Sequence, residues 1–402
     1  MALQLIDSFT IDNAYSAPTL QLCMGDLTNL APEDAVDFLV VSAQPGDYSA
    51  SGGSLIGSLA QAGVSVQQLS NNKAANYEPK IPCWISNTIS SSNSGIQFSR
   101  ILLFEPSNPA TDAAGLVWTI FQALNCFQGN NSTTVALPMV CTGSGGASYQ
   151  DIIQALFYAA TFAGSLSAFP MPVIKLVAYD NDKLQLVQPI FSTLKNNYQN
   201  LVSLNLPGGY QNYAPGVWNA VQGISLKPGL TQRQAFGVRM WTSNYYGIIN
   251  STLRNGNTDP NYYTLMPLFS AIDSGLANIA AFQGETYRGE SQMSAERLAQ
   301  YQVGANILEP GYTSSARPPG SWYNGANYKF NIYGLNSHSI AFLSVYPGED
   351  EYLYPRNMTS TVNGRSCNGD NILCTFTMQQ TTINYCSAEM EEFISKTVIA
   401  IH

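Results

Sequence analysis

The alternation of short apolar runs with helix-length segments constrains the fold of this 402-residue chain most strongly. Five strand-length runs in the first half are apolar or repeat with a period of two: residues 19–24, 36–43, 100–104, 134–140 and 173–178. Helix-length segments lie between and after them, at residues 52–63, 112–124, 150–163 and 183–199. Strands joined through helices form right-handed crossovers. This half therefore predicts an α/β domain with a mainly parallel sheet.

The second half of the chain has a different order of elements. Clustered glycines and prolines at residues 205–229 predict a linker between domains of residues 1–204 and 230–402. Expected helices lie at residues 231–250, 262–274 and 275–282, and expected short strands at 286–288, 311–315, 330–334, 340–344 and 351–355. Helices followed by strands in separate blocks indicate an α+β domain.

The charge of the chain excludes several classes of partner. Only 11% of the residues are charged and the net charge is −9, so the chain lacks the basic surface that nucleic acids and anionic membranes attract. No apolar run reaches the length of a transmembrane helix, and the first residues lack the basic region of an ordinary signal peptide. We therefore expect no nucleic-acid or membrane partner, and a cytoplasmic location.

Histidine and cysteine usage narrows the chemistry further. With two histidines, His338 and His402, the chain cannot form an HExxH helix or a multi-histidine metal cage, and a Ser-His-Asp triad would need one of them. The seven cysteines have no CxxC spacing and favour reduced, buried thiols. Cys367 and Cys374 could close a loop in an exported protein. No metal is expected, and catalysis would use carboxylates, hydroxyls, arginine or backbone amides.

A glycine-rich turn between a strand and a helix is the first candidate binding element. It carries Gly143, Gly145 and Gly146 within residues 137–148. Backbone amides in such a turn, with a helix N-terminus, can hold a diphosphate without any lysine or arginine, although such turns are often merely structural. Together with Asp26 after the first strand and the glycines of residues 52–57, the order and spacing resemble the macro domain, an ADP-ribose-binding α/β fold.

This resemblance covers roughly residues 17–200 and implies ADP-ribose as a ligand. It implies that Asp26 accepts a hydrogen bond from the adenine amino group, and that the two glycine loops hold the phosphates and the distal ribose. Macro-domain hydrolases usually carry an asparagine-containing turn after the second strand, where residues 42–47 read Ser-Ala-Gln-Pro-Gly-Asp. An ADP-ribose reader, or a docking scaffold with a dead pocket, is therefore expected, and not a hydrolase.

Three polar segments of the second half can support glycosidic chemistry. Arg288 ends a short strand and offers a fork of donors suited to a diphosphate. Residues 311–316, Gly-Tyr-Thr-Ser-Ser-Ala, supply hydroxyls that can orient a carboxylate or a ribose. Glu349 and Glu351 stand where a turn enters a strand, and residues two apart in a strand share a face. Such carboxylates stabilise an oxocarbenium-like transition state.

Each segment also has a structural interpretation. Arg288 can form an ion pair with Glu285 or Glu290, the hydroxyls can line an exposed strand edge, and the glutamates can be a solvated turn. The order of the three resembles the arginine-type mono-ADP-ribosyltransferases, which share a fold with many bacterial toxins. Residues 240–254 look like the entry helix of that family, with its tyrosine, Ile-Asn and Leu-Arg. The resemblance covers about residues 226–402 and implies NAD as the substrate.

The resemblance also implies a role for each matching residue. Arg288, with Gly289 beside it, would hold the NAD diphosphate. Ser314, followed by Ser315, would lead the Ser-Thr-Ser motif and orient Glu351 and the nicotinamide ribose. If the register slips by one, Thr313 takes that place. The third hydroxyl of the motif is missing, because the chain has Ala316 there.

The two glutamates complete the implied site. Glu351 would be the catalytic glutamate, bonding the ribose 2′-hydroxyl and stabilising the cation as nicotinamide leaves. Glu349 would position and help deprotonate the guanidinium of an arginine on an acceptor protein. An NAD glycohydrolase and a non-catalytic NAD- or ADP-ribose-binding protein remain as alternatives. Delivery into another cell as a toxin-like effector is also compatible with this family.

Overall fold

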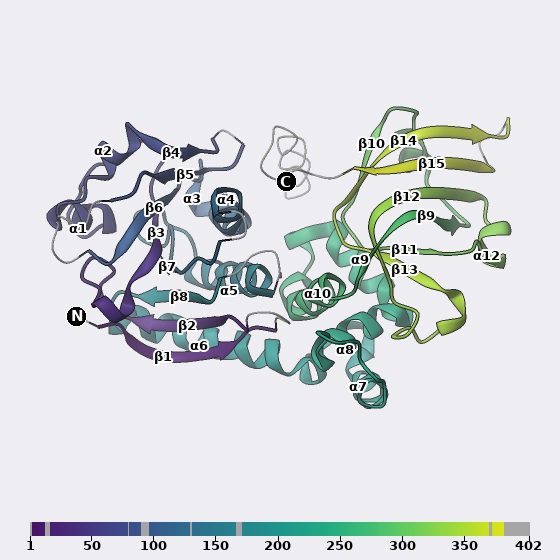
Figure 1. Cartoon of the computed structure of the whole chain (residues 1–402), viewed down its shortest axis with the longest axis horizontal. Helices are drawn as coiled ribbons and strands as arrows, with labels where there is room; N and C mark the ends of the chain where they lie inside the picture. The colour runs from purple at the N-terminus through teal and green to yellow at the C-terminus, as the bar shows by residue number, and fades with distance from the viewer. Residues whose placement is uncertain are drawn as a thin grey trace. The chain divides into compact units, whose positions relative to one another are not determined.

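A computed structural model describes residues 2–12, 17–78, 80–89, 96–128, 131–165, 171–369 and 372–381. The chain divides into two compact units, the first built from residues up to 200 and the second from residue 201 onward. Figure 1 labels most of the helices and strands of each unit.

The first unit is an α/β fold around an eight-stranded sheet. Its central strands are all parallel and lie in the order β2 (Thr19–Met24), β8 (Val173–Ala178), β7 (Val135–Pro138), β3 (Val36–Ser42) and β6 (Phe98–Phe104). These correspond to the five apolar runs of the sequence. The predicted mainly parallel sheet is thus confirmed (Figure 1).

Antiparallel strands extend this sheet at both edges. They are β1 (Gln4–Thr10) beside β2, and β5 (Cys83–Ser86) followed by β4 (Lys73–Asn76) beside β6. The sequence analysis missed them because β1 mixes polar and apolar residues without a clear period, while β4 and β5 have four residues each.

Helices cover both faces of the sheet of the first unit. They are α1 (Leu55–Gln61), α2 (Val66–Ser70), α3 (Pro109–Leu116), α4 (Trp118–Gln128), α5 (Tyr149–Ser165) and α6 (Asn181–Gln199). On β3, Leu39 belongs to the same core cluster as Leu59 of α1, whereas Phe38 meets Phe127 of α4 edge-on. A strand covered on both faces is apolar throughout, which explains the continuous run at residues 36–42.

Helices open the second unit. They are α7 (Ala214–Gln222), α8 (Gln232–Met240), a π-turn at Trp241–Tyr245, α9 (Tyr246–Asn255) and α10 (Tyr262–Ala277). The expected linker at residues 205–229 is instead packed structure, because Val217 and Val221 of α7 are buried in one core with Phe236 of α8. The glycines and prolines there form turns and begin α7, where Pro215 stands in the first turn.

The expected helix boundary at Gly275 is wrong, since α10 runs through it to Ala277 and β9 (Ala281–Glu290) follows. A Cβ at Gly275 would lie 3.0 Å from Val238 and 3.2 Å from the Gln234 carbonyl oxygen, both on α8. Gly275 therefore allows two helices to approach closely and does not end one.

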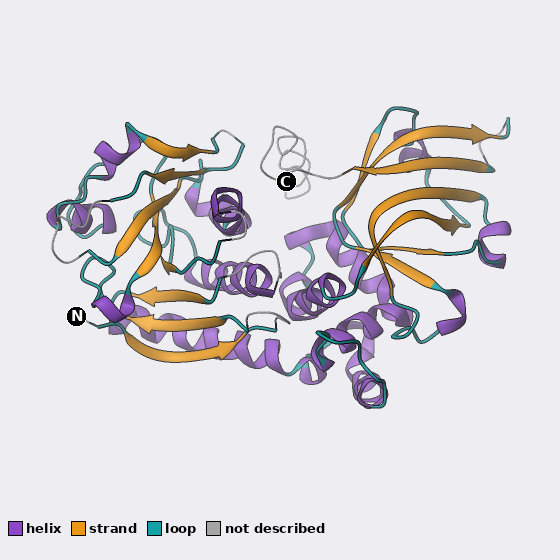
Figure 2. Cartoon of the chain, in the orientation of Figure 1, coloured by secondary structure: helices purple, strands orange, loops and turns teal. Residues whose placement is uncertain are grey.

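Strands form the remainder of the second unit, with two short helices, α11 (Ala295–Gln300) and α12 (Ser321–Asn324). The strands β10 (Asn306–Glu309), β14 (Met358–Cys367), β15 (Cys374–Thr381), β12 (Tyr328–Ser339), β13 (Glu351–Tyr354), β11 (Thr313–Ala316) and β9 lie in that order, and β9 also pairs with β12. The predicted α+β arrangement is present (Figure 2). The expected strand at residues 340–344 is a turn after β12.

The cysteines differ from the expectation of reduced thiols. Cys367 and Cys374 lie opposite each other in the β14–β15 hairpin and form a disulfide. Cys126 is also disulfide-bonded, whereas Cys23, Cys83 and Cys141 are buried free thiols. His338 is buried beside the carbonyl oxygen of Ile279, and His402 lies outside the described residues. None of the helices in the described parts of the chain has both the length and the apolar character to cross a membrane.

Candidate active site

Three neighbouring strands bring the three predicted motifs together. Arg288 of β9 donates from Nη1 to the carbonyl oxygen of Ser314 on β11, at 3.0 Å. The hydroxyl of Ser314 donates to Oε1 of Glu351 on β13, at 2.7 Å. The register pairs Ser314 with Leu353 and Ala316 with Glu351, so Ser314 and Glu351 are diagonal neighbours on one face.

Glu351 is a buried carboxylate with two hydroxyl donors. Its residue is 6% exposed, and its Oε2 accepts a second hydrogen bond from the hydroxyl of Ser344, at 3.3 Å. Burial raises the pKa of Glu351, the bond from Ser314 lowers it, the charge of Glu349 raises it and the bond from Ser344 lowers it. Burial prevails, and the pKa of Glu351 lies above its ordinary value.

Glu349 occupies a different environment from Glu351. It is exposed and ends a single 3₁₀ turn, Pro347–Glu349, and the next residue, Asp350, is left-handed with φ 45°. The strand begins only at Glu351. The expectation that both glutamates share one face of a strand is therefore wrong. They remain close enough for the charge of Glu349 to raise the pKa of Glu351.

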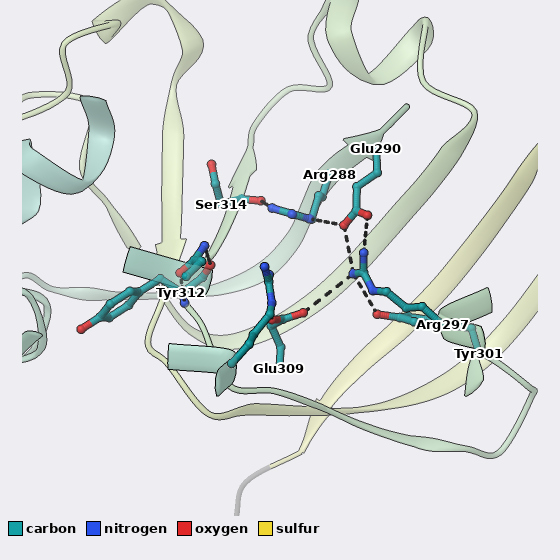
Figure 3. Close-up of polar contacts among 9 residues, drawn as sticks. Arg288, Glu290, Arg297, Tyr301, Glu309, Tyr312 and Ser314 are labelled. Carbon is teal, nitrogen blue, oxygen red and sulfur yellow. Dashed lines mark hydrogen bonds and ion pairs between the residues drawn. The ribbon is translucent and has the colours of Figure 1, made fainter. Parts of the chain in front are cut away.

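Arg288 also makes the ion pair that the structural interpretation allowed. Its Nε bonds Oε1 of Glu290 at 3.0 Å, whereas Glu285 accepts from the hydroxyl of Tyr287. Glu290 in turn holds the guanidinium of Arg297, as Figure 3 shows. Burial opposes ionisation of Glu290, but Arg288 and Arg297 outweigh burial and hold the pKa of Glu290 below its ordinary value.

The ion pairs continue from Glu290 to the helical part of the unit. Arg297 lies 3.8 Å from Glu309 of β10 (Figure 3). Glu309 also pairs with Arg254 of α9 at 2.9 Å. This places Arg288 at one end of a chain of alternating charges. Since Glu290 is its second member, Glu290 fixes the direction in which the guanidinium of Arg288 points.

The start of β11 is anchored to the helices. Asn250 of α9 donates to the carbonyl oxygen of Tyr312 at 3.0 Å and accepts from its amide at 2.9 Å, as a neighbouring strand would. The hydroxyl of Tyr312 donates to the buried Asp273 of α10, which also pairs with Arg356. A Cβ at Gly311 would lie 2.7 Å from Oδ1 of Asn250, so this position favours glycine. These contacts fix where Ser314 lies.

Other predicted residues lie away from the carboxylate of Glu351. The hydroxyl of Ser315 donates to the carbonyl oxygen of Tyr352, because alternate residues of a strand point to opposite faces. Thr313 shares that face with Ser315, so Ser314 is the hydroxyl beside Glu351. A Cβ at Gly289 would lie 2.8 Å from Ala326, which gives Gly289 a role in the packing of the segment after α12.

Ser344 and Arg239 were not anticipated from the sequence. Ser344 lies in the turn after β12, and Arg239 of α8 donates to the carbonyl oxygens of Leu343 at 2.8 Å and Ser344 at 3.1 Å. No motif spacing marks a serine seven residues before a glutamate. The one available signal was that Ser344 stands shortly before the acidic residues Glu349, Asp350 and Glu351.

The second candidate site lies at the carboxyl ends of the parallel strands of the first unit, where α/β folds usually bind ligands. Asp26 follows β2, and its Oδ1 accepts from the amide and the hydroxyl of Thr28. Its Oδ2 accepts no hydrogen bond from the described residues. The amide of Gly25, the residue before Asp26, donates to the carbonyl oxygen of Ala178 at 2.9 Å, and the residue after Ala178, Tyr179, is 66% exposed.

The glycines of the turn after β7 have different roles. Gly146 has a φ of 72°, and a Cβ at Gly145 would lie 2.6 Å from the carbonyl oxygen of Cys141. Both positions are required by the turn itself. Gly143 has no atom within 4 Å of its Cβ position, so it leaves open surface beside the turn.

Parts of the chain are similar in sequence to two curated proteins. No protein-family model matches the chain. A 138-residue part of it, 34% of its length, is 34% identical to the NAD(+)–protein-arginine ADP-ribosyltransferase Tre1 of Serratia proteamaculans and spans 30% of that protein. Mav of Mycobacterium avium is 27% identical over 118 residues, 29% of this chain and 14% of Mav. The chain thus spans less than a third of either curated relative.

Two solved structures are similar to half of the chain. The type III effector XopAI of Xanthomonas axonopodis pv. citri, solved without 70 N-terminal residues, is 15% identical with a TM-score of 0.39. The match covers 50% of this chain and 94% of the solved XopAI chain. Exoenzyme S of Pseudomonas aeruginosa is 14% identical with a TM-score of 0.36, covering 50% and 96%. In sequence, part of this chain is similar to an arginine ADP-ribosyltransferase.

Proposed function

We propose that this chain is a mono-ADP-ribosyltransferase that cleaves NAD and transfers ADP-ribose to an arginine of an acceptor protein. The observation that carries the proposal is the connection of Arg288, Ser314 and Glu351 across three strands. The resemblance to arginine-type mono-ADP-ribosyltransferases assigns the NAD site to these three motifs. The sequence similarity to Tre1 supports the same activity.

Arg288 is suited to the diphosphate of NAD. Its Nε and Nη1 are held by Glu290 and by the carbonyl oxygen of Ser314, while Nη2 bonds none of the described residues. A guanidinium fixed in this way keeps donors in a defined direction for an anionic group. With the diphosphate on Arg288, the nicotinamide ribose would lie beside the neighbouring strands β11 and β13.

Glu351 performs the cleavage step in this proposal. As the bond from ribose C1′ to nicotinamide breaks, positive charge develops on the ribose, and a carboxylate held by Ser314 and Ser344 stabilises it without reorienting. A carboxylate has about four lone-pair positions, so it can still accept from the ribose 2′-hydroxyl. The ionised form is the active one, and nicotinamide leaves as a neutral molecule.

Glu349 serves the acceptor in this proposal. Its exposed turn lets an arginine side chain of another protein reach it. A guanidinium nitrogen forms the new bond to C1′, and its proton passes to Glu349 and then to solvent. The products are nicotinamide and ADP-ribosylarginine.

The test is the acceptor dependence of NAD cleavage. The chain is incubated with NAD, with and without agmatine as a guanidine acceptor, and nicotinamide and ADP-ribosylagmatine are quantified. A transferase yields both products with agmatine, an NAD glycohydrolase yields nicotinamide and free ADP-ribose in both mixtures, and a binding protein yields neither.

We further propose that the first unit is macro-like and binds ADP-ribose without hydrolysing it. Support comes from Asp26, Tyr179 and the glycine turn, which follow the carboxyl ends of the parallel strands β2, β8 and β7. Oδ2 of Asp26, which accepts no hydrogen bond from any residue that the structure describes, suits an adenine amino group. The exposed ring of Tyr179 suits stacking on adenine. The phosphates would lie on the turn around Gly143. Calorimetry with ADP-ribose tests this proposal.

A further inference from the structure

Ser344 makes two hydrogen bonds with its hydroxyl. It is 4% exposed, donates to Oε2 of Glu351 at 3.3 Å and accepts from the amide of Tyr346 at 3.0 Å. Because an amide can only donate, it takes a lone pair of the hydroxyl, and the proton of Ser344 is left to point at the carboxylate. The hydroxyl is thus oriented by the backbone of the following turn.

The same turn carries Glu349. The amide of Glu349 donates to the carbonyl oxygen of Tyr346 at 3.1 Å. A path made of hydrogen bonds and the backbone of Tyr346 therefore runs from the carboxylate of Glu351 through Ser344 to Glu349. The path fixes the position of the exposed turn relative to the buried carboxylate.

Two side chains of the helical layer hold the backbone around Ser344. Arg239 donates to the carbonyl oxygens of Leu343 and Ser344, and the hydroxyl of Thr242 accepts from the amide of Val345 at 3.2 Å. These bonds fix the backbone on both sides of the serine. The serine is therefore a rigid support for Glu351.

We propose that Ser344 is a positioning residue that orients Glu351 and couples it to the turn that carries Glu349. It supplies a hydroxyl to the site in a chain that has Ala316 at the last position of the Ser-Thr-Ser motif. This inference rests on the proposed function, in which Glu351 assists NAD cleavage and Glu349 assists the acceptor.

Loss of this hydroxyl has two consequences. Oε2 of the buried Glu351 loses a donor, which disfavours its ionised form. The turn also loses the hydrogen bond from the amide of Tyr346, although Arg239 and Thr242 still hold the backbone around residue 344. Transfer to an acceptor should therefore suffer more than cleavage of NAD. The elements around Glu351 carry other charged or titratable side chains, and none of them is changed by a substitution at Ser344. They are Glu285, Arg288 and Glu290 of β9, Arg233 and Arg239 of α8, Arg317 after β11, Lys329 and His338 of β12, and Glu349 and Asp350 of the turn.

The experiment compares Ser344→Ala, Ser344→Thr and a matched control, Ser274→Ala. Ser274 is also a buried serine, but its hydroxyl donates to the carbonyl oxygen of Ser270 within α10. For Ser344→Ala we expect kcat of NAD cleavage to fall about tenfold with little change in KM, the acid limb of the pH profile to move to higher pH, and transfer to fall further than cleavage.

Ser344→Thr retains the hydroxyl and should restore the pH profile and the ratio of transfer to cleavage. Ser274→Ala should leave both unchanged. An unaltered pH profile in Ser344→Ala, a rise in KM alone, or the same changes in Ser274→Ala would overturn the inference.

A second measurement separates this inference from the proposed function. The ionisation of Glu351 is followed by NMR in the full chain without NAD, with carboxyl-labelled glutamate and Glu351→Gln to assign the signal. Ser344→Ala should titrate at higher pH than the wild type, and an identical midpoint would refute the positioning role. This result is obtained even if the wild type releases no nicotinamide, which would contradict the proposed function alone.

Discussion

The hydroxyl of Ser314 donates to Oε1 of Glu351 at 2.7 Å across the β11–β13 pair. The carbonyl oxygen of the same serine accepts from Arg288. One residue therefore sets the distance between the group proposed to hold the NAD diphosphate and the group proposed to assist cleavage. Changes to its hydroxyl and to the partners of Arg288 should have separable effects.

Ser314→Ala removes the hydroxyl and keeps the backbone bond to Arg288. We expect kcat to fall by on the order of tenfold or more, with KM for NAD nearly unchanged. Since the bond from Ser314 favours the ionised carboxylate, its loss raises the pKa of Glu351 further, and activity should rise only at higher pH. Steady-state kinetics across pH measure both effects. A pH profile identical to the wild type would contradict this prediction.

Glu290→Gln should weaken NAD binding without a direct effect on cleavage. The variant takes away the carboxylate that orients Arg288 and pairs with Arg297, so KM should rise about tenfold while kcat changes less. Glu285→Gln is the control, because Glu285 bonds Tyr287 and not Arg288. Equal KM values for the two variants would show that Glu290 does not position Arg288.

Asp26→Ala should weaken ADP-ribose binding by the first unit, and Gly143→Leu should block it. A carboxylate hydrogen bond to the adenine amino group is worth about 1.5–3 kcal/mol, so Asp26→Ala should weaken binding about tenfold to a hundredfold. Leucine at position 143 has room in the free protein and would occupy the surface proposed for the phosphates. Gly145→Leu is unsuitable, because it would collide with the carbonyl oxygen of Cys141.

Calorimetry on the full chain with Arg288→Ala measures this binding, since the second unit then lacks its proposed diphosphate contact. Glu33→Ala is the charge control, because Glu33 is exposed and precedes β3, at the opposite ends of the strands from Asp26. A dissociation constant of roughly 1 mM corresponds to a binding free energy of about 4 kcal/mol. If millimolar ADP-ribose produces no heat, the first unit does not bind ADP-ribose and is a docking scaffold.

Elements with strong local signals were predictable from the sequence. β2 and β8 have the predicted bounds, because strands covered on both faces or alternating with a period of two leave an apolar pattern. β1 and β4 are the two edge strands of the sheet, are only partly buried, and leave no such pattern. At Gly275 the sequence predicted a boundary between two helices that the structure does not have. Glycine is typical of helix ends, but here it lets α8 pack closely against α10.

The candidate site was predictable as a set of motifs but not as geometry. The order of Arg288, Ser314 and Glu351 singled them out, and the structure connects them by hydrogen bonds. The separation of Glu349 from the strand depends on the left-handed Asp350, which the sequence does not mark. The role of Ser344 depends on a tertiary contact between its turn and Glu351, and no spacing rule in the sequence predicts such a contact.

Glu349→Gln should separate the two halves of the proposed reaction. Glu349 is exposed on its turn while Glu351 is buried, so the amide should impair deprotonation of the acceptor and leave NAD cleavage largely intact. Nicotinamide release and ADP-ribosylagmatine formation are measured in the same reaction. If both activities fall equally, Glu349 contributes to the NAD site and not to the acceptor site.

The role of Glu351 is the central claim of the proposed mechanism. Formation of ADP-ribosylagmatine from NAD, followed by mass spectrometry in the wild type and in Glu351→Gln, tests it most directly. Removing a charge that acts mainly in the transition state should lower the rate by on the order of 10²–10³, while NAD binding and the folded structure persist. Product formation by Glu351→Gln near the wild-type rate, or no product from the wild type, would contradict the account.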